Sequence, residues 1–577
     1  MTSTLSHPET PYPEIDAELA ALREGAAVWA AMPVGAKIEL LQACRQGVHA
    51  VSRRWTKAAA GAKGIAGTPL AGEEAVSGPW AVLLALNRYL DTLQQIDAAG
   101  APAIAPSRVR TRAGGQVVVD VFPVDLYDRV LLNGMRAEVW MQPEVTPQTL
   151  AATMGVWYRR SERRPRVALV LGAGNIASIP ALDVLYKLIA EGAVCALKMN
   201  PVNDYLGPIF EEAFEPLVRG GFLRLAYGGA AAGKYLCAHP AIDEVHVTGS
   251  AATHDAIVWG DGPEAAARKL RRDPVLRKPI TSELGNVSPT IVLPGAWTHA
   301  DFRFQAENVL TQKLHNDGFN CIAAQVLILP SEWDGTPKLL AAIEELAAAA
   351  ADRPAYYPGA AQRLQTVTAG AGDVLRYGRR DGDFLPRTLF FVDAGAASPA
   401  FSVEAFSSAL AVTTLPGDFE TFARDAVAFA NDRLRGSLGG NLIVDPHAHR
   451  QHEGAVDEAI AAMRYGCVGV NAWTGVGFLR CETPWGAFPG ETLEDVRSGI
   501  GSVHNAHLFS KPQKSVVYAP FAPFPRSLFG YGGSLLPKPP WFVTNRRQAQ
   551  IGEALCDFEY AKSPWTLAKV ALLAMTA

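Results

Sequence analysis

The chain has 577 residues, of which 49% are hydrophobic, and its 53 basic and 57 acidic side chains give a net charge of −4. The chain is longer than a typical single domain, so we predict two or more domains. Its balanced charge gives no sign of the basic surface that binds nucleic acid. Seven scattered cysteines without a CxxC pair argue against a disulfide framework and a structural zinc site, and favour a reducing compartment. No basic segment followed by an apolar one opens the chain, and no run of 18 apolar residues occurs. We therefore expect a cytoplasmic, soluble protein without an integral membrane segment.

The predicted elements change in character along the chain. From about residue 15 to 100, apolar residues recur at helical spacing and predict an all-helical part. Residues 114–144 switch to β-branched, alternating runs, which predict a strand-rich insertion. From Val167 to about Leu293, short apolar strands alternate with helical segments, the pattern of a doubly wound parallel sheet. A second α/β series extends over 323–473, and a Pro- and aromatic-rich stretch then leads to an apolar end.

A glycine-rich turn follows the first of these strands. Residues 172–177 fit the pattern GxGxxA that binds dinucleotides. Such a fold also needs a carboxylate about 20 residues on, at the end of the second strand, to hold the adenosine ribose. That strand ends here in Lys198, followed by Met199, Asn200 and Pro201. With the acid missing, the turn fits either a cofactor site or only a tight connection from strand to helix.

Three later segments carry residues suited to chemistry. Thr248, Gly249 and Ser250 end a strand before a helix, where backbone N–H groups and the helix dipole favour a phosphate. Glu283 lies at a strand or linker end within Glu-Leu-Gly. Cys321 lies in a turn that contains Gly and Asn, just before a strand.

In this order, the four stretches resemble the aldehyde dehydrogenase superfamily, over about residues 20 to 520. The family pattern is an Asn in the first turn, a Lys ending the next strand, a Gly-Ser turn, Glu-Leu-Gly, Gly-x-x-Cys and Glu-x-Phe. The matching residues are Asn175, Lys198, Gly249-Ser250, Glu283-Leu284-Gly285, Gly318 to Cys321 and Glu404-Ala405-Phe406. Residues 466–490 resemble the family's Gly-x-Val-x-Val-Asn and Pro-Phe-Gly-Gly region.

The resemblance implies oxidation of a small-molecule aldehyde to a carboxylic acid. A thiolate attacks an aldehyde carbonyl better than a hydroxyl does, which suits Cys321 as the nucleophile. In the family, the Asn side-chain amide and the Cys backbone N–H stabilise the oxyanion, here Asn175 and Cys321. A hydride then passes to a nicotinamide, and Glu283 is the candidate general base that hydrolyses the thioester. Taken singly, these residues fit a buried cysteine, a turn residue and a surface charge, and only the motif set makes them catalytic.

The resemblance also implies NAD or NADP as cofactor. The implied cofactor-binding residues are Lys198, Gly229, Gly249, Ser250, Leu284, Gly285, Glu404 and Phe406. Lys198 and Glu404 would hold riboses, and Phe406 would lie on the nicotinamide side. Many members follow the strand-end Lys with a Glu that selects NAD, whereas this chain has Met199, Asn200 and Pro201. The choice between NAD and NADP therefore stays open.

The implied fold is α/β, with a doubly wound Rossmann-like cofactor domain, an α/β catalytic domain and a small β oligomerisation element. We expect the cofactor domain at 1–115 and 161–283 and the catalytic domain at 284–505. The oligomerisation element would comprise 116–160 and 506–524, followed by a C-terminal extension at 525–577. Family members associate through such an element, so a homodimer or homotetramer is expected.

Several features leave alternatives open. A basic insertion between Gly249 and Glu283 fits a solvated flap or a phosphate contact, and charge runs favour the flap. The end 564–577 is too short to span a bilayer, and we expect it to pack on a neighbouring subunit. Three further aromatic residues fit a substrate tunnel or the core: Trp473, Phe478 and Trp485. Three histidines, at 447, 449 and 452, lack supporting cysteine or carboxylate spacing, so we expect no metal.

Two other functions compete with aldehyde oxidation. In a CoA-acylating dehydrogenase, CoA rather than water would resolve the thioester, but such relatives generally lack the Glu of Glu-Leu-Gly, and Glu283 is present. A catalytically silent homologue used for binding would tend to lose Cys, Asn or Glu, and all three are present.

Overall fold

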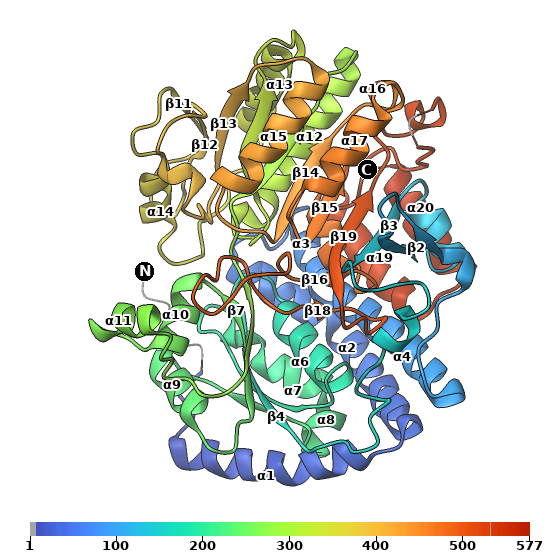
Figure 1. The fold of residues 1–577 in the computed structure, drawn as a ribbon, viewed down its shortest axis with the longest axis vertical. Helices are drawn as coiled ribbons and strands as arrows, with labels where there is room; N and C mark the ends of the chain where they lie inside the picture. The colour runs from blue at the N-terminus through green and yellow to red at the C-terminus, as the bar shows by residue number, and fades with distance from the viewer. Residues whose placement is uncertain (1–6, 531, 577) are drawn as a thin grey trace.

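The computed structural model describes residues 7–530 and 532–576, and its N-terminal part is helical, as predicted (Figure 1). Its helices are α1 (Tyr12–Ala31), α2 (Val34–Ala62), α3 (Ala71–Ala75), the π-helix η1 (Val76–Trp80) and α4 (Ala81–Ala99). Pro11 and Pro33 occupy the N-cap positions of α1 and α2, and Gly100 ends α4 in a left-handed conformation, with φ at 78°. These helices place α3 and η1 behind the site described below.

The smaller of the two main sheets is doubly wound. Its order is β17-β8-β7-β4-β5-β6. The strands are β4 (Val167–Leu171), β5 (Val194–Lys198), β6 (Leu223–Ala226), β7 (Glu244–Gly249), β8 (Ile280–Leu284) and β17 (Gly499–Ile500). All are parallel except β17, which pairs antiparallel with β8. Successive strands are added on one side of β4, up to β6, and the next strand, β7, is added on the other side of β4. The place where the strand order reverses is called the switch point, and ligands bind there, outside the carboxyl ends of the strands.

Helices alternate with these strands. They are α6 (Ile179–Ile189), α7 (Gly207–Ala213), α8 (Glu215–Arg219), α9 (Ala230–Ala238), α10 (Ala251–Trp259) and α11 (Glu264–Arg271). Every residue of α6 is buried, because it packs on β4 and β5 and also contacts α4. The long helix α1 packs on β5 and β6.

The larger sheet has eleven strands in the order β1-β2-β3-β19-β15-β14-β9-β10-β13-β12-β11. On one side lie β1 (Val109–Thr111), β2 (Val117–Phe122), β3 (Arg136–Met141) and β19 (Pro512–Tyr518). The others are β15 (Cys467–Val470), β14 (Gly439–Ile443), β9 (Ser288–Val292), β10 (Ala324–Pro330), β13 (Ala409–Leu415), β12 (Arg387–Phe391) and β11 (Val374–Tyr377). Neighbours from β19 to β12 run parallel, whereas β1 to β3 and β11 pair antiparallel.

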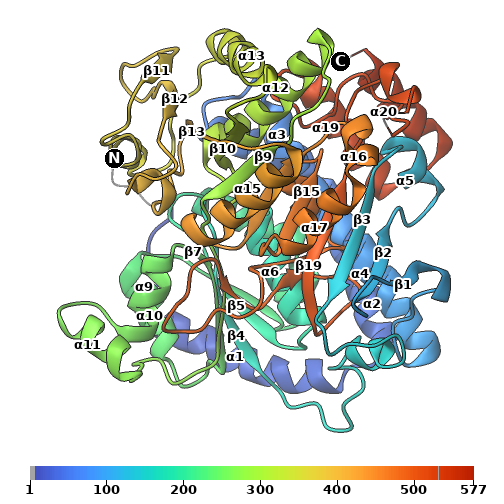
Figure 2. The same cartoon turned by 45° about the horizontal axis from the view of Figure 1, so that its top comes forward.

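Helices cover both faces of this sheet, as Figure 2 shows. Alternate side chains of β10 point to opposite faces, so Val326 and Ile328 enter one core and Leu327 and Leu329 another. The first core packs against α15 (Phe419–Arg433) and α17 (Glu453–Ala462). The second packs against α12 (His299–Leu314) and α13 (Gly335–Ala349). The expectation of an α/β fold with a doubly wound sheet is confirmed.

Two local predictions were wrong. Residues 289–293 were expected in the first series, but β9 lies in the larger sheet, between β10 and β14. The predicted strand-rich insertion is interrupted by α5 (Leu126–Leu131). Asp125 caps this helix by accepting a hydrogen bond from the Asp128 backbone N–H at 2.9 Å, and that capping outweighs the β-branched composition.

The C-terminal extension packs on its own chain. Helix α19 (Gln548–Tyr560) lies against α3 and η1, and α20 (Pro564–Met575) packs on α19 and α5. Val570 and Ala574 bury the inner face of α20, while Trp565 stays 86% exposed. The inner face of α20 is thus covered by its own chain, and the packing of 564–577 on a neighbouring subunit stays a prediction for its exposed outer face. Within the described residues, no helix combines the length and the apolar character that crossing a membrane requires.

Candidate active site

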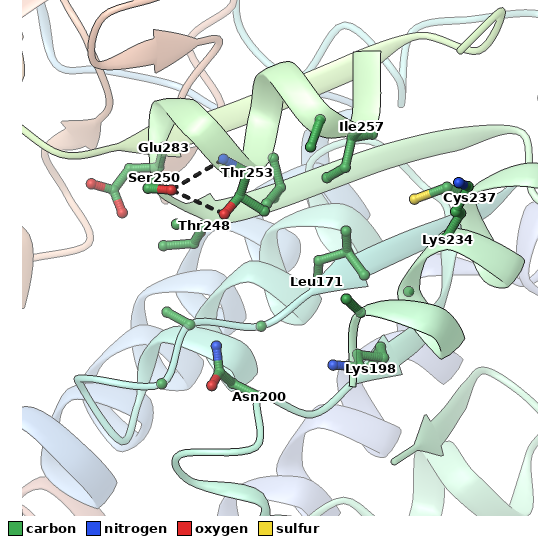
Figure 3. Close-up of a pocket in the computed structure, with 18 of the residues that line it drawn as sticks. Leu171, Lys198, Asn200, Lys234, Cys237, Thr248, Ser250, Thr253, Ile257 and Glu283 are labelled. Atoms are coloured by element: carbon green, nitrogen blue, oxygen red, sulfur yellow. Dashed lines mark hydrogen bonds between the residues drawn. The ribbon is translucent and has the colours of Figure 1, made fainter. Parts of the chain in front are cut away.

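A cavity of about 870 Å³ opens at the switch point of the smaller sheet (Figure 3). Nine of the eleven predicted site residues line it: Asn175, Lys198, Gly229, Gly249, Ser250, Glu283, Cys321, Glu404 and Phe406. Lys198 and Asn200 lie across the cavity from Ser250 and Thr253 in Figure 3. The structure thus brings together residues that are up to 231 positions apart (175 to 406).

The thiol end of the cavity is built on a strained turn. The 3-10 turn η5 (His315–Gly318) leads into Cys321, just before β10. Asn316, Asp317 and Gly318 have φ values of 53°, 54° and 78°, so three successive residues are left-handed. Two of them are not glycine, and strain of this kind persists only where surrounding contacts hold it. Cys321 is accordingly held in the turn that the sequence predicted.

Asn175 ties the first turn of the smaller sheet to the cysteine turn. Its side-chain Nδ2 donates a hydrogen bond to the Phe319 carbonyl at 2.9 Å. Its own carbonyl accepts hydrogen bonds from Asn316 Nδ2 at 3.1 Å and from the Tyr356 hydroxyl at 2.9 Å. These bonds fix the amide of Asn175 beside the loop that carries the thiol.

Glu283 and Cys321 line the same cavity, and each affects the pKa of the other. Glu283 is the fourth residue of the five in β8, is 3% exposed, and its Oε1 has no hydrogen-bond partner among the described residues. Burial raises the pKa of its carboxyl to about 8, although the hydrogen bond with Cys321 opposes that rise. Burial and the neighbouring carboxylate of Glu283 likewise raise the pKa of the Cys321 thiol well above its ordinary value. Well below pH 8, the Glu283 carboxyl is therefore mostly protonated.

A second carboxyl, that of the half-buried Glu404, lies near the thiol. Burial raises its pKa to about 8, against the opposing charge of Arg363 and a hydrogen bond from the Asn286 backbone. A Cβ at Gly285 would collide with this carboxyl, so Gly285 serves close approach and does not itself line the cavity. Leu284 is fully buried and absent from the cavity wall, so the structure gives its side chain no contact with a ligand there.

Phe406 forms part of an aromatic wall. Its ring packs edge-on against Tyr357, with centroids 4.8 Å apart, and lies 5.7 Å from Phe319. Its φ of 39° is unusual for a bulky side chain. Arg363 Nη2 donates to the Phe406 carbonyl at 3.3 Å, which helps hold this conformation.

The opposite end of the cavity presents backbone and small residues. Ser250 caps α10 by accepting a hydrogen bond from the Thr253 N–H at 3.1 Å, so the helix N-terminus faces the cavity. At Gly229 and Gly233, an added Cβ would meet only open space. Burial lowers the pKa of Lys198 to about 8. This end can admit a flat adenosine group and a pyrophosphate, and so fits a dinucleotide.

The basic insertion forms the short helix α11, which packs beside α10 and has no buried residue. Lys269 pairs with Asp255 at 2.7 Å. The return segment lines the cavity with Val275, Leu276 and Arg277. The insertion is thus a solvated flap whose return forms part of the wall.

Sequence reasoning missed a buried charge network behind the thiol. Glu73 accepts hydrogen bonds from the Asn316 backbone N–H at 2.9 Å and from Arg353 Nη1 at 3.0 Å. Lys63 Nζ pairs with Glu74 at 2.7 Å and also donates to the Asn316 side chain at 3.0 Å. These groups connect α2 and α3 to the strained turn. No sequence motif predicts these contacts, because Glu73 and Asn316 are 243 positions apart.

The remaining candidates lie outside the cavity. Trp473, Phe478 and Trp485 are 4%, 8% and 1% exposed and are absent from its wall, so they are core aromatics in this structure. His452 stacks on Phe419 and faces Glu420. Across the described ranges, no group of three potential metal-ligating side chains was found.

Comparison with known sequences supports the resemblance. Residues 178–478 match the sequence model described as "Aldehyde dehydrogenase family". A human 4-trimethylaminobutyraldehyde dehydrogenase is 37% identical over 127 residues. That match covers 22% of this chain and only 23% of the relative's length.

Comparison with solved structures extends the likeness over most of the chain. The NADP complex of NADP-dependent glyceraldehyde-3-phosphate dehydrogenase from Bacillus halodurans has a TM-score of 0.59 at 16% identity, covering 88% of this chain and 92% of that one. A mutant of aldehyde dehydrogenase C from Pseudomonas syringae, with NAD+ and octanal, has a TM-score of 0.59 at 17% identity, covering 89% and 90%. At these identities, the likeness establishes the fold.

Proposed function

The chain belongs to the aldehyde dehydrogenase family, and from that premise we propose that it oxidises an aldehyde to a carboxylic acid with NAD or NADP as hydride acceptor. The two solved structures named above are described with NADP and NAD+, and the cavity at the switch point fits such a dinucleotide. The observation that carries the proposal is that Cys321, Glu283 and Asn175 line one cavity together with the predicted cofactor-binding residues Lys198, Gly249 and Ser250.

Attack by Cys321 begins the proposed reaction. Once the thiol has given up its proton, Sγ bonds to the aldehyde carbon and the carbonyl oxygen becomes an oxyanion. The Asn175 amide and the Cys321 backbone N–H are the donors proposed to stabilise that charge. The thiol proton passes to solvent, so the carboxylate of Glu283 stays available as the base for the later hydrolysis. The cavity residues would hold the cofactor, whose oxidised nicotinamide would serve as the acceptor for the hydride.

Hydrolysis releases the product. Loss of the hydride leaves a thioester on Cys321, and Glu283 as general base takes a proton from the attacking water. The acyl–sulfur bond breaks, the acid leaves, and the thiol regains its proton. The burial of Glu283 suits this role, since it raises the pKa of the carboxyl to about 8 and so strengthens the base.

The state of assembly and the division into domains are also proposals. We propose a homodimer or homotetramer formed through strands of the predicted oligomerisation element, of which β2, β3 and β19 are part. Light scattering after gel filtration would check this, and a monomer at micromolar concentration would contradict it. A cytoplasmic location stays a prediction.

A spectrophotometric screen tests the proposed reaction. NAD(P)H absorbance is followed with short, long-chain, aromatic and semialdehyde substrates, with NAD+ or NADP+, and with and without CoA. We expect turnover without CoA and release of free acid. Turnover that requires CoA would favour the acylating reaction, and no turnover with any aldehyde would contradict the proposal.

A further inference from the structure

A short N-terminal arm, residues 7–11, packs on Tyr227, close to the part of the cavity wall that Gly229 forms. The Thr10 N–H donates to the Tyr227 carbonyl at 3.1 Å, and the Tyr227 N–H donates to the Thr10 hydroxyl at 2.9 Å. The His7 ring also packs against Tyr227, with centroids 4.9 Å apart. Because Gly229, two residues further on, lines the cavity, these contacts fix the arm next to the adenosine end.

The arm places the carboxylate of Glu9 beside that end. An added Cβ at Gly228 would lie 2.9 Å from both Cγ and Oε1 of Glu9, so this side chain lies directly over Gly228. Glu9 is exposed, and its charge acts on Lys198, which lines the cavity. Asp204 also acts on Lys198, but it is fully buried, whereas Glu9 is open to a ligand.

The strand that normally provides an acid here does not. After Lys198, β5 is followed by Met199, Asn200 and Pro201, and none is acidic. Asn200 Oδ1 already accepts a hydrogen bond from the Val202 N–H at 3.0 Å. A ribose bound beside Lys198 would therefore find its carboxylate partner on the arm and not on the sheet.

We infer that Glu9 binds the adenosine ribose hydroxyls together with Lys198 and makes the cavity select NAD over NADP. This inference rests on the proposed use of a nicotinamide cofactor. A carboxylate accepts hydrogen bonds from the 2′- and 3′-hydroxyls, and the same carboxylate repels a 2′-phosphate.

The other cations near this end already have partners. Lys234 pairs with Asp261 at 3.1 Å, and Arg277 pairs with Asp273 at 2.8 Å. Lys278 Nζ donates to the Cys237 carbonyl at 2.9 Å. A 2′-phosphate would share Lys234 and Arg277 with the carboxylates of Asp261 and Asp273.

Isothermal titration tests the inference without any aldehyde. NAD+ and NADP+ are each titrated into the full chain, into Glu9→Gln and into Glu14→Gln, which changes an exposed glutamate five residues away. We expect the unmodified chain to bind NAD+ at least about tenfold more tightly than NADP+. Glu9→Gln should reduce this ratio to within about threefold, through weaker NAD+ and tighter NADP+ binding, and Glu14→Gln should leave it unchanged.

Two results would overturn the role of Glu9: binding of NADP+ as tight as NAD+ by the unmodified chain, or an unaltered ratio in Glu9→Gln. If the NAD+ preference and its loss in Glu9→Gln are seen but no aldehyde is oxidised, the inference stands and the proposed reaction fails. Binding of neither nucleotide overturns both.

Discussion

The two ends of the cavity are formed by different kinds of residue. The adenosine end consists of strand ends, glycines and the N-terminus of α10, and its cations pair with exposed acids such as Asp261 and Asp273. The thiol end buries ionisable groups. There, the pKa values of Glu283 and Glu404 rise to about 8, and the pKa of Lys313 falls to about 7 because of burial.

The difference indicates a division of labour. Backbone and glycine surfaces recognise a ligand by shape and hydrogen bonding, so changes there should alter binding with little effect on chemistry. Buried groups with pKa values near neutrality exchange protons readily, so changes there should alter rates. Substitutions at the two ends can separate these effects.

The largest effect is expected for Cys321→Ala. Removing Sγ removes the nucleophile, so aldehyde oxidation should fall below detection while NAD+ binding persists, measured by absorbance and titration. Cys237→Ala is the matched control, because Cys237 lines the same cavity at its other end. Retained turnover in Cys321→Ala, or its loss in Cys237→Ala, would contradict the assignment.

Glu283→Gln should slow turnover by about 10²–10⁴-fold. The amide cannot act as general base in hydrolysis, so the thioester should accumulate. Stopped-flow absorbance should show a rapid burst of NADH followed by a slow phase. Absence of the burst, with the slow phase also lost, would assign Glu283 to an earlier step.

The pH profile of the unmodified enzyme provides the control. Because burial raises the pKa of Glu283 to about 8, its carboxyl is protonated below that pH and cannot act as base. Hydrolysis-limited turnover should therefore rise as pH increases through about 8, and this rise should vanish in Glu283→Gln. A profile that is flat between pH 6 and 9 would exclude Glu283 as the titrating group.

Glu73→Gln should destabilise the fold by about 3–5 kcal/mol, since it leaves Arg353 buried without its carboxylate partner. Chemical denaturation measures this loss. The exposed pair Arg303–Glu345 provides the control, and Glu345→Gln should cost less than about 1 kcal/mol. Equal costs for the two variants would contradict the structural role of the network.

The smallest effect is expected for Gly233→Val at the binding end. Its side chain would project into open space in the cavity, so the KM for NAD+ should rise by about tenfold through steric exclusion. The kcat at saturation and the unfolding midpoint should change little. A large fall in kcat with an unchanged KM would contradict the division between the two ends.

Local patterns predicted much of the molecule. The strand alternation gave the βαβ series, and six short motifs located Cys321, Glu283 and Asn175. The interruption by α5 carried a signal, since Asp125 is a strong N-cap residue three positions before Asp128. No local signal in the sequence shows to which sheet β9 belongs, because strand pairing depends on contacts between distant parts of the chain.

The contacts that support the site were beyond local patterns. Glu73 and Arg353 stand in stretches that show only helical or loop character, and their pairing depends on packing between elements 280 positions apart. In the sequence, Glu9 is one acidic residue among many. Its position beside the cavity becomes visible only in the structure, where Thr10 pairs with Tyr227. Sequence motifs thus locate the groups that we propose to react, whereas the groups that we propose to position them or to select the cofactor appear only in three dimensions.

The most direct test of the covalent mechanism uses mass spectrometry on Glu283→Gln. The variant is mixed with a substrate aldehyde and NAD+, quenched in acid and digested, and the cysteine-containing peptides are compared. The account predicts a mass increase equal to the acyl group on the peptide that contains Cys321, dependent on NAD+. An unmodified Cys321 peptide during turnover, or an acyl group on a different cysteine, would contradict it.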